Sequence, residues 1–414
     1  MITSIRAPLA LLIAAVLCAP AAAENWQYMG NLDAYAGQYF FQNGAGSVNG
    51  YATAQAQQMK SLSSASGFYF NESSVYTGFK QVDELAGGGT LFQQSWDNSA
   101  AATWISRFDG GYSLKPHAGL TQEMYRETND EAWGNGLYDY WRYNAGLTFE
   151  RKTRLGLSVP WTYQFSYDAY YTHYPHFTTL ASQFGAALGA PNPGAHTLDT
   201  ITNQLSYRSD FDLPGFASVW GLYSLSLVSY PDQNIVDSQD NYIASKRADT
   251  YQYLNLGGTK RLTDWDMGSW GRVRPFVGMS LSFDDLFSNQ NNFDDDPAHL
   301  QYTPGYFNYW EGHLSPNVAL TFLKPMLTTR LGYDIAYRAY TSRQTQDASG
   351  GYTGGLLHQY IQALTLDVAY PIVGNLELKA RGIWSLSRAN TQYEQTYVYN
   401  YKTYNYFVGL GWKL

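Results

Sequence analysis

Three groups of side chains in this 414-residue sequence are of types that bind ions or transfer protons. Charged residues recur at every second position in several segments, His173 and His176 stand three residues apart, and residues 294–296 are all aspartate. Alternate positions share one face of an extended strand, and rings of charge inside a pore set its ion preference. Paired histidines suit a transition metal, and clustered carboxylates suit a hard cation.

The histidine pair and the aspartate triplet are predicted to be solvated rather than to hold a metal. Pro175 disfavours the helix on which residues three apart would share a face, and no third ligand stands beside the pair. The triplet lacks the Gly and the terminal Glu of a calcium loop. We therefore predict no metal site and no cofactor.

The seven histidines also give little sign of an enzyme. Most of them fall in predicted loops or near strand ends, and no serine beside them has the context of a nucleophile elbow. Catalytic partners need not be close in sequence. A hydrolase therefore stays the lesser alternative to a protein without catalytic activity.

The charged residues lie in segments whose hydrophobicity alternates with a period of two. From Leu327 to Ala339 the odd positions are mainly apolar, whereas Arg330, Asp334 and Arg338 all fall on even positions. The segments that begin at 273 and 376 divide in the same way. A helix would mix the two sets within two turns, so these segments are predicted to be half-buried strands.

Aromatic residues are frequent for a chain of this polarity. The sequence has 37 Tyr, 20 Phe and 12 Trp, yet its mean hydropathy is −0.35. A transmembrane β-barrel explains this combination, because apolar positions facing lipid alternate with polar positions facing water. The net charge of −8 argues against a nucleic-acid partner, since such binders are basic.

The first 23 residues have the pattern of a secretory signal peptide. A basic start that includes Arg6 precedes an apolar run from Ala7 to Cys18, and small residues lead to Ala23. The run is too short to span a bilayer, and the small residues predict cleavage after Ala23. We expect residues 24–414 to be a single domain without cysteine, and therefore without disulfides or thiol chemistry.

The last strand of the sequence carries a family resemblance. Its apolar positions alternate up to the final residue, at Tyr406, Val408, Leu410, Trp412 and Leu414. This pattern resembles the C-terminal signal that the outer-membrane assembly machinery recognises, although that signal normally ends in Phe rather than Leu. At the superfamily level, the chain resembles Gram-negative outer-membrane β-barrel proteins, in particular porin-like channels.

The resemblance implies an all-β fold, a transmembrane antiparallel up-and-down barrel with short periplasmic turns and long external loops. It also implies contacts with outer-membrane lipid, lipopolysaccharide and the assembly machinery. Strands are predicted near 28–41, 47–60, 67–80, 101–114, 117–128, 139–152, 158–174, 200–213, 216–230, 242–261, 271–286, 306–323, 327–343, 357–371, 375–390 and 399–414. That is about 16 strands, with 14 or 18 as alternatives, and 81–100 is predicted to be a loop or a partial hairpin.

Tight turns are predicted at 115–116, around 154, and at 214–215, 324–326 and 373–375. Longer loops are predicted at 129–138, 175–199, 231–241, 287–305, 344–356 and 391–398. The loop 175–199 is unusually apolar, and Phe177, Leu180, Phe184 and Leu188 suggest a constriction folded into the lumen or a contact with a neighbouring subunit of a homo-oligomer.

Charged residues on the inward face are predicted to line the lumen and to set its selectivity. About 16 strands make a barrel too wide for side chains to fill, which favours a water-filled path. The predicted lumen residues are Arg107, Asp109, Arg142, Glu150, Arg208, Asp210, Arg272, Arg274, Arg330, Asp334, Arg338, Asp367, Glu377, Lys379 and Arg381.

The function expected from these features is an outer-membrane channel for small hydrophilic solutes. An alternative is a saccharide channel or an exopolysaccharide export barrel, since inward aromatics such as Tyr125, Tyr170, Trp220 and Phe276 have faces on which sugars stack. A second alternative is a barrel with a structural or adhesive role and no transport.

Overall fold

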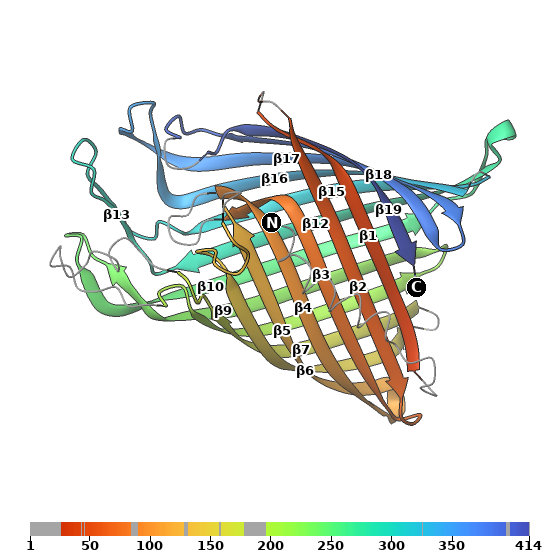
Figure 1. The fold of residues 1–414 in the computed structure, drawn as a ribbon. Helices are drawn as coiled ribbons and strands as arrows, with labels where there is room; N and C mark the ends of the chain where they lie inside the picture. Colours follow the sequence, from red (N-terminus) through yellow and green to blue (C-terminus); the bar gives the residue numbers. More distant parts are fainter. Residues whose placement is uncertain are drawn as a thin grey trace.

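The computed structural model of the protein describes residues 26–413 except 43, 45, 84–89, 128–130, 157–158, 178–195, 325 and 395–397. Within this part of the chain, sixteen long antiparallel strands form one sheet that closes on itself (Figure 1). Each strand pairs with its neighbours along the chain, and the first pairs with the last. The predicted up-and-down barrel of about 16 strands is therefore confirmed.

The wall strands have 13 to 22 residues, more than the roughly 9–11 that cross a bilayer. They are β1 (Trp26–Phe41), β2 (Ser47–Ser61), β3 (Ser66–Asp83), β4 (Thr90–Phe108), β5 (Tyr112–Arg126), β6 (Tyr140–Leu155), β7 (Val159–His173), β8 (Thr200–Leu213), β9 (Ala217–Val236), β10 (Tyr242–Arg261), β12 (Arg272–Ser288), β15 (Tyr309–Leu323), β16 (Met326–Gln346), β17 (Tyr352–Val373), β18 (Leu376–Ala389) and β19 (Tyr401–Lys413). Among the described residues, no helix is long and apolar enough to span a membrane.

The connections differ at the two ends of the barrel. At one end, which we call the short-turn end, most connections have two to four residues, as at 109–111, 214–216 and 374–375. Its longest connection, 262–271, contains the short strand β11 (Trp265–Asp266) and the single turn η2 (Gly268–Trp270). At the long-loop end lie 127–139, 174–199, 390–400 and 289–308, the last with the hairpin β13 (Asn292–Asp294) and β14 (Gln301–Thr303).

Two predictions between residues 81 and 116 are corrected by the structure. Residues 81–83 and 90–100 belong to β3 and β4, so a loop over 81–100 is wrong, whereas the alternative of a hairpin agrees with the pairing of these two strands. The turn between β4 and β5 is the single turn η1 (Asp109–Gly111), where Gly110 and Gly111 have φ of 77° and 79°, and not 115–116. Glycine adopts such left-handed angles without steric cost, whereas Pro116 is accommodated inside β5, opposite Leu147.

Two predicted loops at the long-loop end are shorter than expected. Residues 231–236 continue β9, and most of 344–356 continues β16 and β17. These segments are polar, and they pair beyond register irregularities, as between Ala339 and Gln344. Polar strands of this kind alternate weakly, because neither of their faces has to be apolar to meet lipid.

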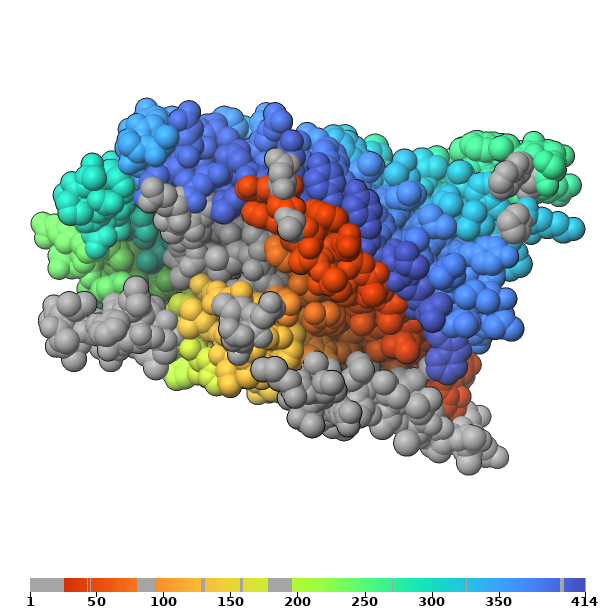
Figure 2. All heavy atoms as spheres, turned by 45° about the horizontal axis from the view of Figure 1, so that its top comes forward, coloured from red at the N-terminus to blue at the C-terminus, as the bar shows by residue number. Residues whose placement is uncertain are grey.

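The barrel closes where β1 pairs with β19, the first and last strands that Figure 2 shows side by side in red and blue. Eleven residues of β1, from Asn31 to Phe41, have partners on β19. Each backbone N–H or C=O left unpaired in lipid would cost several kcal/mol. Closure therefore pairs the backbone groups of the two edge strands, which neither water nor a loop could pair inside the membrane.

The outward face of the wall is apolar and the inward face is charged. Large apolar side chains on the outward face remain exposed to the surroundings, for example Leu205, Leu227, Leu281, Leu331 and Val408. The four apolar residues of the predicted assembly signal that the structure describes, Tyr406, Val408, Leu410 and Trp412, also point outward and are 40–60% exposed. Leu414 lies outside the described residues.

Polar residues on the outward face are paired by tyrosines of a neighbouring strand. The hydroxyl group of Tyr167 donates to Asn203 at 2.7 Å, that of Tyr223 donates to Gln252 at 3.0 Å, and that of Tyr333 donates to Gln362 at 2.9 Å. A polar group that faces hydrocarbon without a hydrogen bond is costly. These pairs allow three amides to occupy outward positions.

The outward face of β1–β4 differs from the rest of the wall. This face consists of every second residue, in register with the outward residues Leu32 and Trp104, yet most of its central positions are small or polar. We call these positions the small-residue face: Gly30, Ala34, Ala52, Ala54, Ala56, Glu72, Ser74, Asn98, Ala100 and Ala102. Glu72 lies between the outward aromatics Phe70 and Tyr76 of its own strand.

Closure depends on a glycine at the seam, which yields a test. A Cβ added to Gly37 would stand 1.7 Å from the carbonyl oxygen of Tyr406, which is backbone and has little freedom to move. We predict that Gly37→Ala destabilises the barrel by at least about 2 kcal/mol, measured as the urea midpoint of folding into detergent or lipid. The matched control is Gly332→Ala, whose added Cβ meets no heavy atom within 4 Å. Equal midpoints for the two variants would contradict the prediction.

Candidate functional site

Inward-facing ions cross the seam on its lumen side. The ammonium group of Lys379 on β18 lies 2.5 Å from Asp33 on β1, and both side chains lie against Gly411 of the intervening strand β19, where an added Cβ would be 2.4 Å from Asp33. Glu377 pairs with Lys413 at 2.5 Å and lies 3.7 Å from Lys379. This seam cluster therefore links the first strand to the last two.

A further ion pair extends the seam cluster toward β17. The guanidinium group of Arg381 donates to Asp367 at 2.6 Å and lies over the rings of Tyr35 and Tyr51, at 5.5 and 5.3 Å. Arg330 stands opposite Asp367 in the β16–β17 register. Predicted lumen residues from three adjacent strands thus meet here.

A second group, the histidine cluster, joins the three neighbouring strands β12, β15 and β16. His313 on β15 lies 2.6 Å from Glu311, 3.4 Å from Asp334 on β16 and 4.0 Å from Asp284 on β12. Arg338 donates to Glu311, which is 5% exposed. Asp334 and Arg338 are among the predicted lumen residues, whereas His313 and Glu311 were not predicted from sequence.

Other inward charges pair within one or two strands. Glu150 accepts from Lys115 and Gln164, each at 2.7 Å. His117 lies 2.6 Å from Asp168. Arg208 donates to both oxygens of Asp210, two residues further along β8. Carboxylates and cations that share the lumen are therefore close to one another, and the inner surface is polar along several strands.

Some predicted lumen residues lie apart from these groups. The prediction that Asp109 lies in a strand and faces the lumen is wrong, because Asp109 begins the exposed turn η1. Arg107 lies opposite Ser113, and the guanidinium group of Arg142 donates to Thr172 at 3.2 Å. Arg272 is the first, exposed residue of β12.

Arg274 belongs to the short-turn end rather than to a lumen cluster. It lies 3.4 Å from Asp264 in the connection 262–271, and Arg261 lies 3.0 Å from the same carboxylate. The hydrogen bond from Arg261 holds the pKa of Asp264 below its ordinary value. This carboxylate therefore stays ionised and holds together the two arginines that flank the longest short-turn connection.

The predicted constriction residues are described only in part. Phe177 is buried against Tyr138, with ring centroids 5.8 Å apart, in an aromatic cluster that includes Tyr140, Tyr174 and Leu198. This cluster lies at the long-loop end, where Tyr140 donates a hydrogen bond to Glu123. Leu180, Phe184 and Leu188 lie outside the described residues, so the constriction itself stays a prediction.

Two buried arginines hold the connection 289–308 at the rim. Arg343 lies 4.3 Å from the ring of Tyr306 and also donates to Tyr399. Arg247 pairs with Asp249 at 2.8 Å and lies 4.5 Å from the ring of Phe307. Cation–π contacts of desolvated arginines contribute about 2 kcal/mol. The connection is therefore fixed over the strand ends.

Next to Arg343 is a cavity of about 300 Å³ with both polar and aromatic walls. Tyr352 donates to Asp294 at 2.8 Å, and Nδ1 of His299 lies 2.9 Å from the same carboxylate oxygen. The aspartate triplet thus contributes to a tyrosine-rich cavity: Asp294, Asp295, Asp296, His299, Tyr306, Arg343, Tyr352, Tyr393 and Tyr399.

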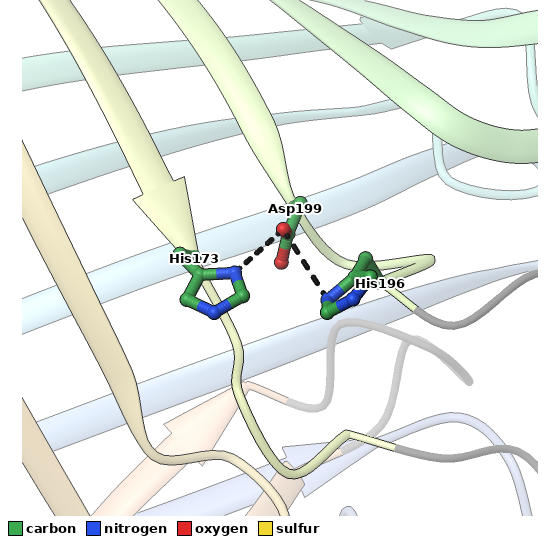
Figure 3. Close-up of side chains that lie close together, drawn as sticks. All are labelled: His173, His196 and Asp199. Atoms are coloured by element: carbon green, nitrogen blue, oxygen red, sulfur yellow. Dashed lines mark hydrogen bonds and ion pairs between the residues drawn. The ribbon is translucent and has the colours of Figure 1, made fainter.

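A rim site that the sequence analysis missed joins His173, His196 and Asp199 (Figure 3). His173 ends β7, and Asp199 directly precedes β8. The Nδ1 atoms of His173 and His196 lie 2.7 and 3.6 Å from Oδ2 of Asp199. The sequence pair of His173 with His176 was predicted to be solvated, and His176 is exposed. The β7–β8 pairing instead brings His173 close to residues at the far end of the 26-residue connection 174–199.

The closed wall, apolar outside and charged inside, defines the class of protein as a transmembrane β-barrel. No protein-family model matches the sequence, and no curated protein is significantly similar to it.

Structural similarity extends to several solved outer-membrane proteins. The first is a loop-deletion mutant of OmpT, which is an outer membrane protein of Vibrio cholerae. The second is an anion-selective porin from Comamonas acidovorans, and the third is a bacterial polysaccharide outer membrane secretin. Their identities are 8%, 8% and 9%, and their TM-scores 0.42, 0.44 and 0.42. They cover 94%, 94% and 93% of this chain, and 100%, 99% and 98% of their own.

Asp139, which directly precedes β6 in the connection 127–139, makes stability depend on pH. Its carboxylate accepts from the backbone N–H of Tyr125 at 2.6 Å and of Gly136 at 3.0 Å. Burial nevertheless raises the pKa of Asp139 from 3.8 to about 6. A raised carboxyl pKa contributes stability that is complete below pH 3.8 and is lost as the pH rises through 6.

We therefore predict that the free energy of unfolding falls by up to about 3 kcal/mol between pH 4 and pH 7 because of this group. Asp139→Asn keeps one carbonyl oxygen, which can accept one of the two N–H groups. Because the amide does not titrate, the variant should lack this component of the pH dependence. Urea titrations of both proteins at several pH values measure it. An unchanged slope in Asp139→Asn would assign the pH dependence to other groups.

Proposed function

We propose that the protein is a channel in the outer membrane of a Gram-negative bacterium, passing small hydrophilic solutes through a mixed-charge lumen. The observation that carries the proposal is the pair of charge clusters on the lumen face, the seam cluster on β17, β18, β19 and β1 and the histidine cluster on β12, β15 and β16. Charged side chains inside a barrel need water or one another, and a barrel of sixteen strands is wider than its side chains fill. In this proposal the short-turn end faces the periplasm, and export uses the predicted signal peptide, residues 1–23.

The lumen charges predict the ion preference. Replacing both Lys379 and Arg381 by Gln removes two inward cations, because both residues face the lumen. We predict that the double variant becomes more cation-selective than the native protein, seen as a shift of the reversal potential in planar bilayers under a KCl gradient. Lys402→Gln on the outward parity of β19 is the control, and it should leave the reversal potential unchanged.

The bilayer recordings decide among the functional candidates. Single-channel steps with the predicted shift support the diffusion channel. Steps without any shift in the double variant would reject the seam cluster as a selectivity element. Complete absence of conductance from folded protein would reject transport and favour a structural or adhesive barrel.

A saccharide channel is the second candidate, and the rim cavity favours it. Tyr306, Tyr352 and Arg343 combine faces on which sugars stack with hydrogen-bond donors, and Asp294 supplies acceptors. Pockets of about 300 Å³ and more with a few placed polar groups are typical of small-ligand sites. Block of the conductance by millimolar oligosaccharide, absent with a small salt of equal osmolality, would support this candidate over a general channel.

We also propose that the small-residue face contacts a second copy of the chain. Oε2 of Glu72 and Nδ2 of Asn98 find no hydrogen-bond partner among the described residues, unlike the three outward amides that tyrosines pair. A carboxylate acceptor and an amide donor on the same face are self-complementary across a symmetric interface. Small residues allow two such faces to approach closely in a membrane.

This contact predicts the oligomeric state. Glu72→Ala should shift the folded protein toward monomer by on the order of tenfold or more in dissociation constant, measured by native mass spectrometry or light scattering in mild detergent. Glu377→Ala, which removes a lumen carboxylate, is the control and should keep the native oligomer. A monomeric native protein in lipid nanodiscs would overturn the proposal.

A further inference from the structure

We propose that His173, His196 and Asp199 bind a divalent transition metal, with Zn²⁺ as the preferred ion. The three donor atoms all lie within 4.8 Å of one another, and Figure 3 shows both imidazole rings directed at the carboxylate between them. Ligands of a tetrahedral zinc ion at about 2.0–2.2 Å lie a little over 3 Å apart. The observed separations of 2.7 and 3.6 Å bracket that value.

Asp199 is oriented as a ligand would be. Its Oδ1 accepts the backbone N–H of Tyr174 at 2.8 Å, and its side chain is 6% exposed. Its Oδ2 is left facing the two histidines, with the hydroxyl group of Tyr171 at 3.2 Å. Metal-binding carboxylates are commonly fixed by hydrogen bonds of this kind from outside the ligand set.

His196 has a backbone conformation that directs it to the same point. Its φ of 75° is in the left-handed region, which residues other than glycine rarely adopt. Such conformations persist when the surrounding structure requires them, and they cluster at functional sites. Here the consequence is that the imidazole of His196 stands 5.2 Å from that of His173, centroid to centroid.

The donor set indicates the class of metal. Two imidazoles and one carboxylate suit Zn²⁺ and its neighbours in the first transition row, whereas Ca²⁺ and Mg²⁺ prefer oxygen ligands alone. Three protein ligands leave a fourth position open. The side chains of His173 and His196 are 32% and 46% exposed, so an ion from the medium has direct access.

The metal would connect two neighbouring strands at the rim of the barrel. His173 is the last residue of β7 and Asp199 is adjacent to the first residue of β8, so one ion would join both ends of the connection 174–199. The site faces outward beside Tyr171, whose ring stacks on His173 at 6.2 Å. Binding would therefore stabilise the folded barrel and not depend on whether the lumen conducts.

Calorimetric titration of Zn²⁺ into the folded, detergent-solubilised protein tests the proposal. We expect one Zn²⁺ site in the native protein. His173→Ala and His196→Ala should each reduce its Zn²⁺ affinity on the order of 100-fold or more. The matched control is His176→Ala, an exposed histidine three residues from His173, which should bind as the native protein does. Heat-modifiable migration on gels establishes that each variant is folded.

A measurement on the native protein needs no variant. X-ray absorption at the zinc edge should show a mixed nitrogen and oxygen shell with two imidazoles. An all-oxygen shell, equal loss of binding in His176→Ala, or no site in the micromolar range would each overturn the proposal. Because none of these readouts uses conductance, their failure is separate from failure of the proposed channel.

Discussion

The pairing of β1 with β19 is the interaction on which the rest of the structure depends. A sheet in lipid has no water to satisfy its edges, so sixteen strands are stable there only if the first and last strands complete the ladder. Eleven residue pairs accomplish this. The side chains are arranged around the same line, with Leu32 opposite Trp412 on the lipid side and the Asp33–Lys379 ion pair on the lumen side.

Closure also fixes what each face must be. Once the strands are paired, every second side chain is committed to lipid and the others to the lumen. Leu331 and Leu366 therefore face outward together, whereas Arg330 and Asp367, one position away, face inward together. The charge clusters are a consequence of this alternation, because inward ions on adjacent strands are brought within reach of one another without any loop to position them.

The fold was predictable from sequence where lipid imposes the pattern, and less so elsewhere. β16 and β18 were correctly predicted because large apolar residues occupy their outward positions. The part of β3 and β4 near residues 81–100 was missed because the small-residue face replaces the large apolar residues on which alternation depends. Gly110 and Gly111 form the turn that was assigned to 115–116, since a proline in the strand is a stronger sequence signal than two glycines beside an aspartate.

The candidate sites were harder to predict because they depend on register. Asp334 and Arg338 were recognised on one strand, but their contacts with His313 and Glu311 require the β15–β16 alignment. His173 meets Asp199 only because Thr172 pairs with Thr200. Along the chain His176 is the histidine nearest to His173, whereas a hairpin makes residues 26 positions apart adjacent.

The position of β19 between β1 and β18 makes the barrel sensitive to the loss of one strand. Without residues 401–413 the other fifteen strands would remain paired, yet the edges of β1 and β18 would face lipid, each with a row of unpaired peptide groups. A single strand of 13 residues therefore decides whether the other fifteen have a stable state in a membrane.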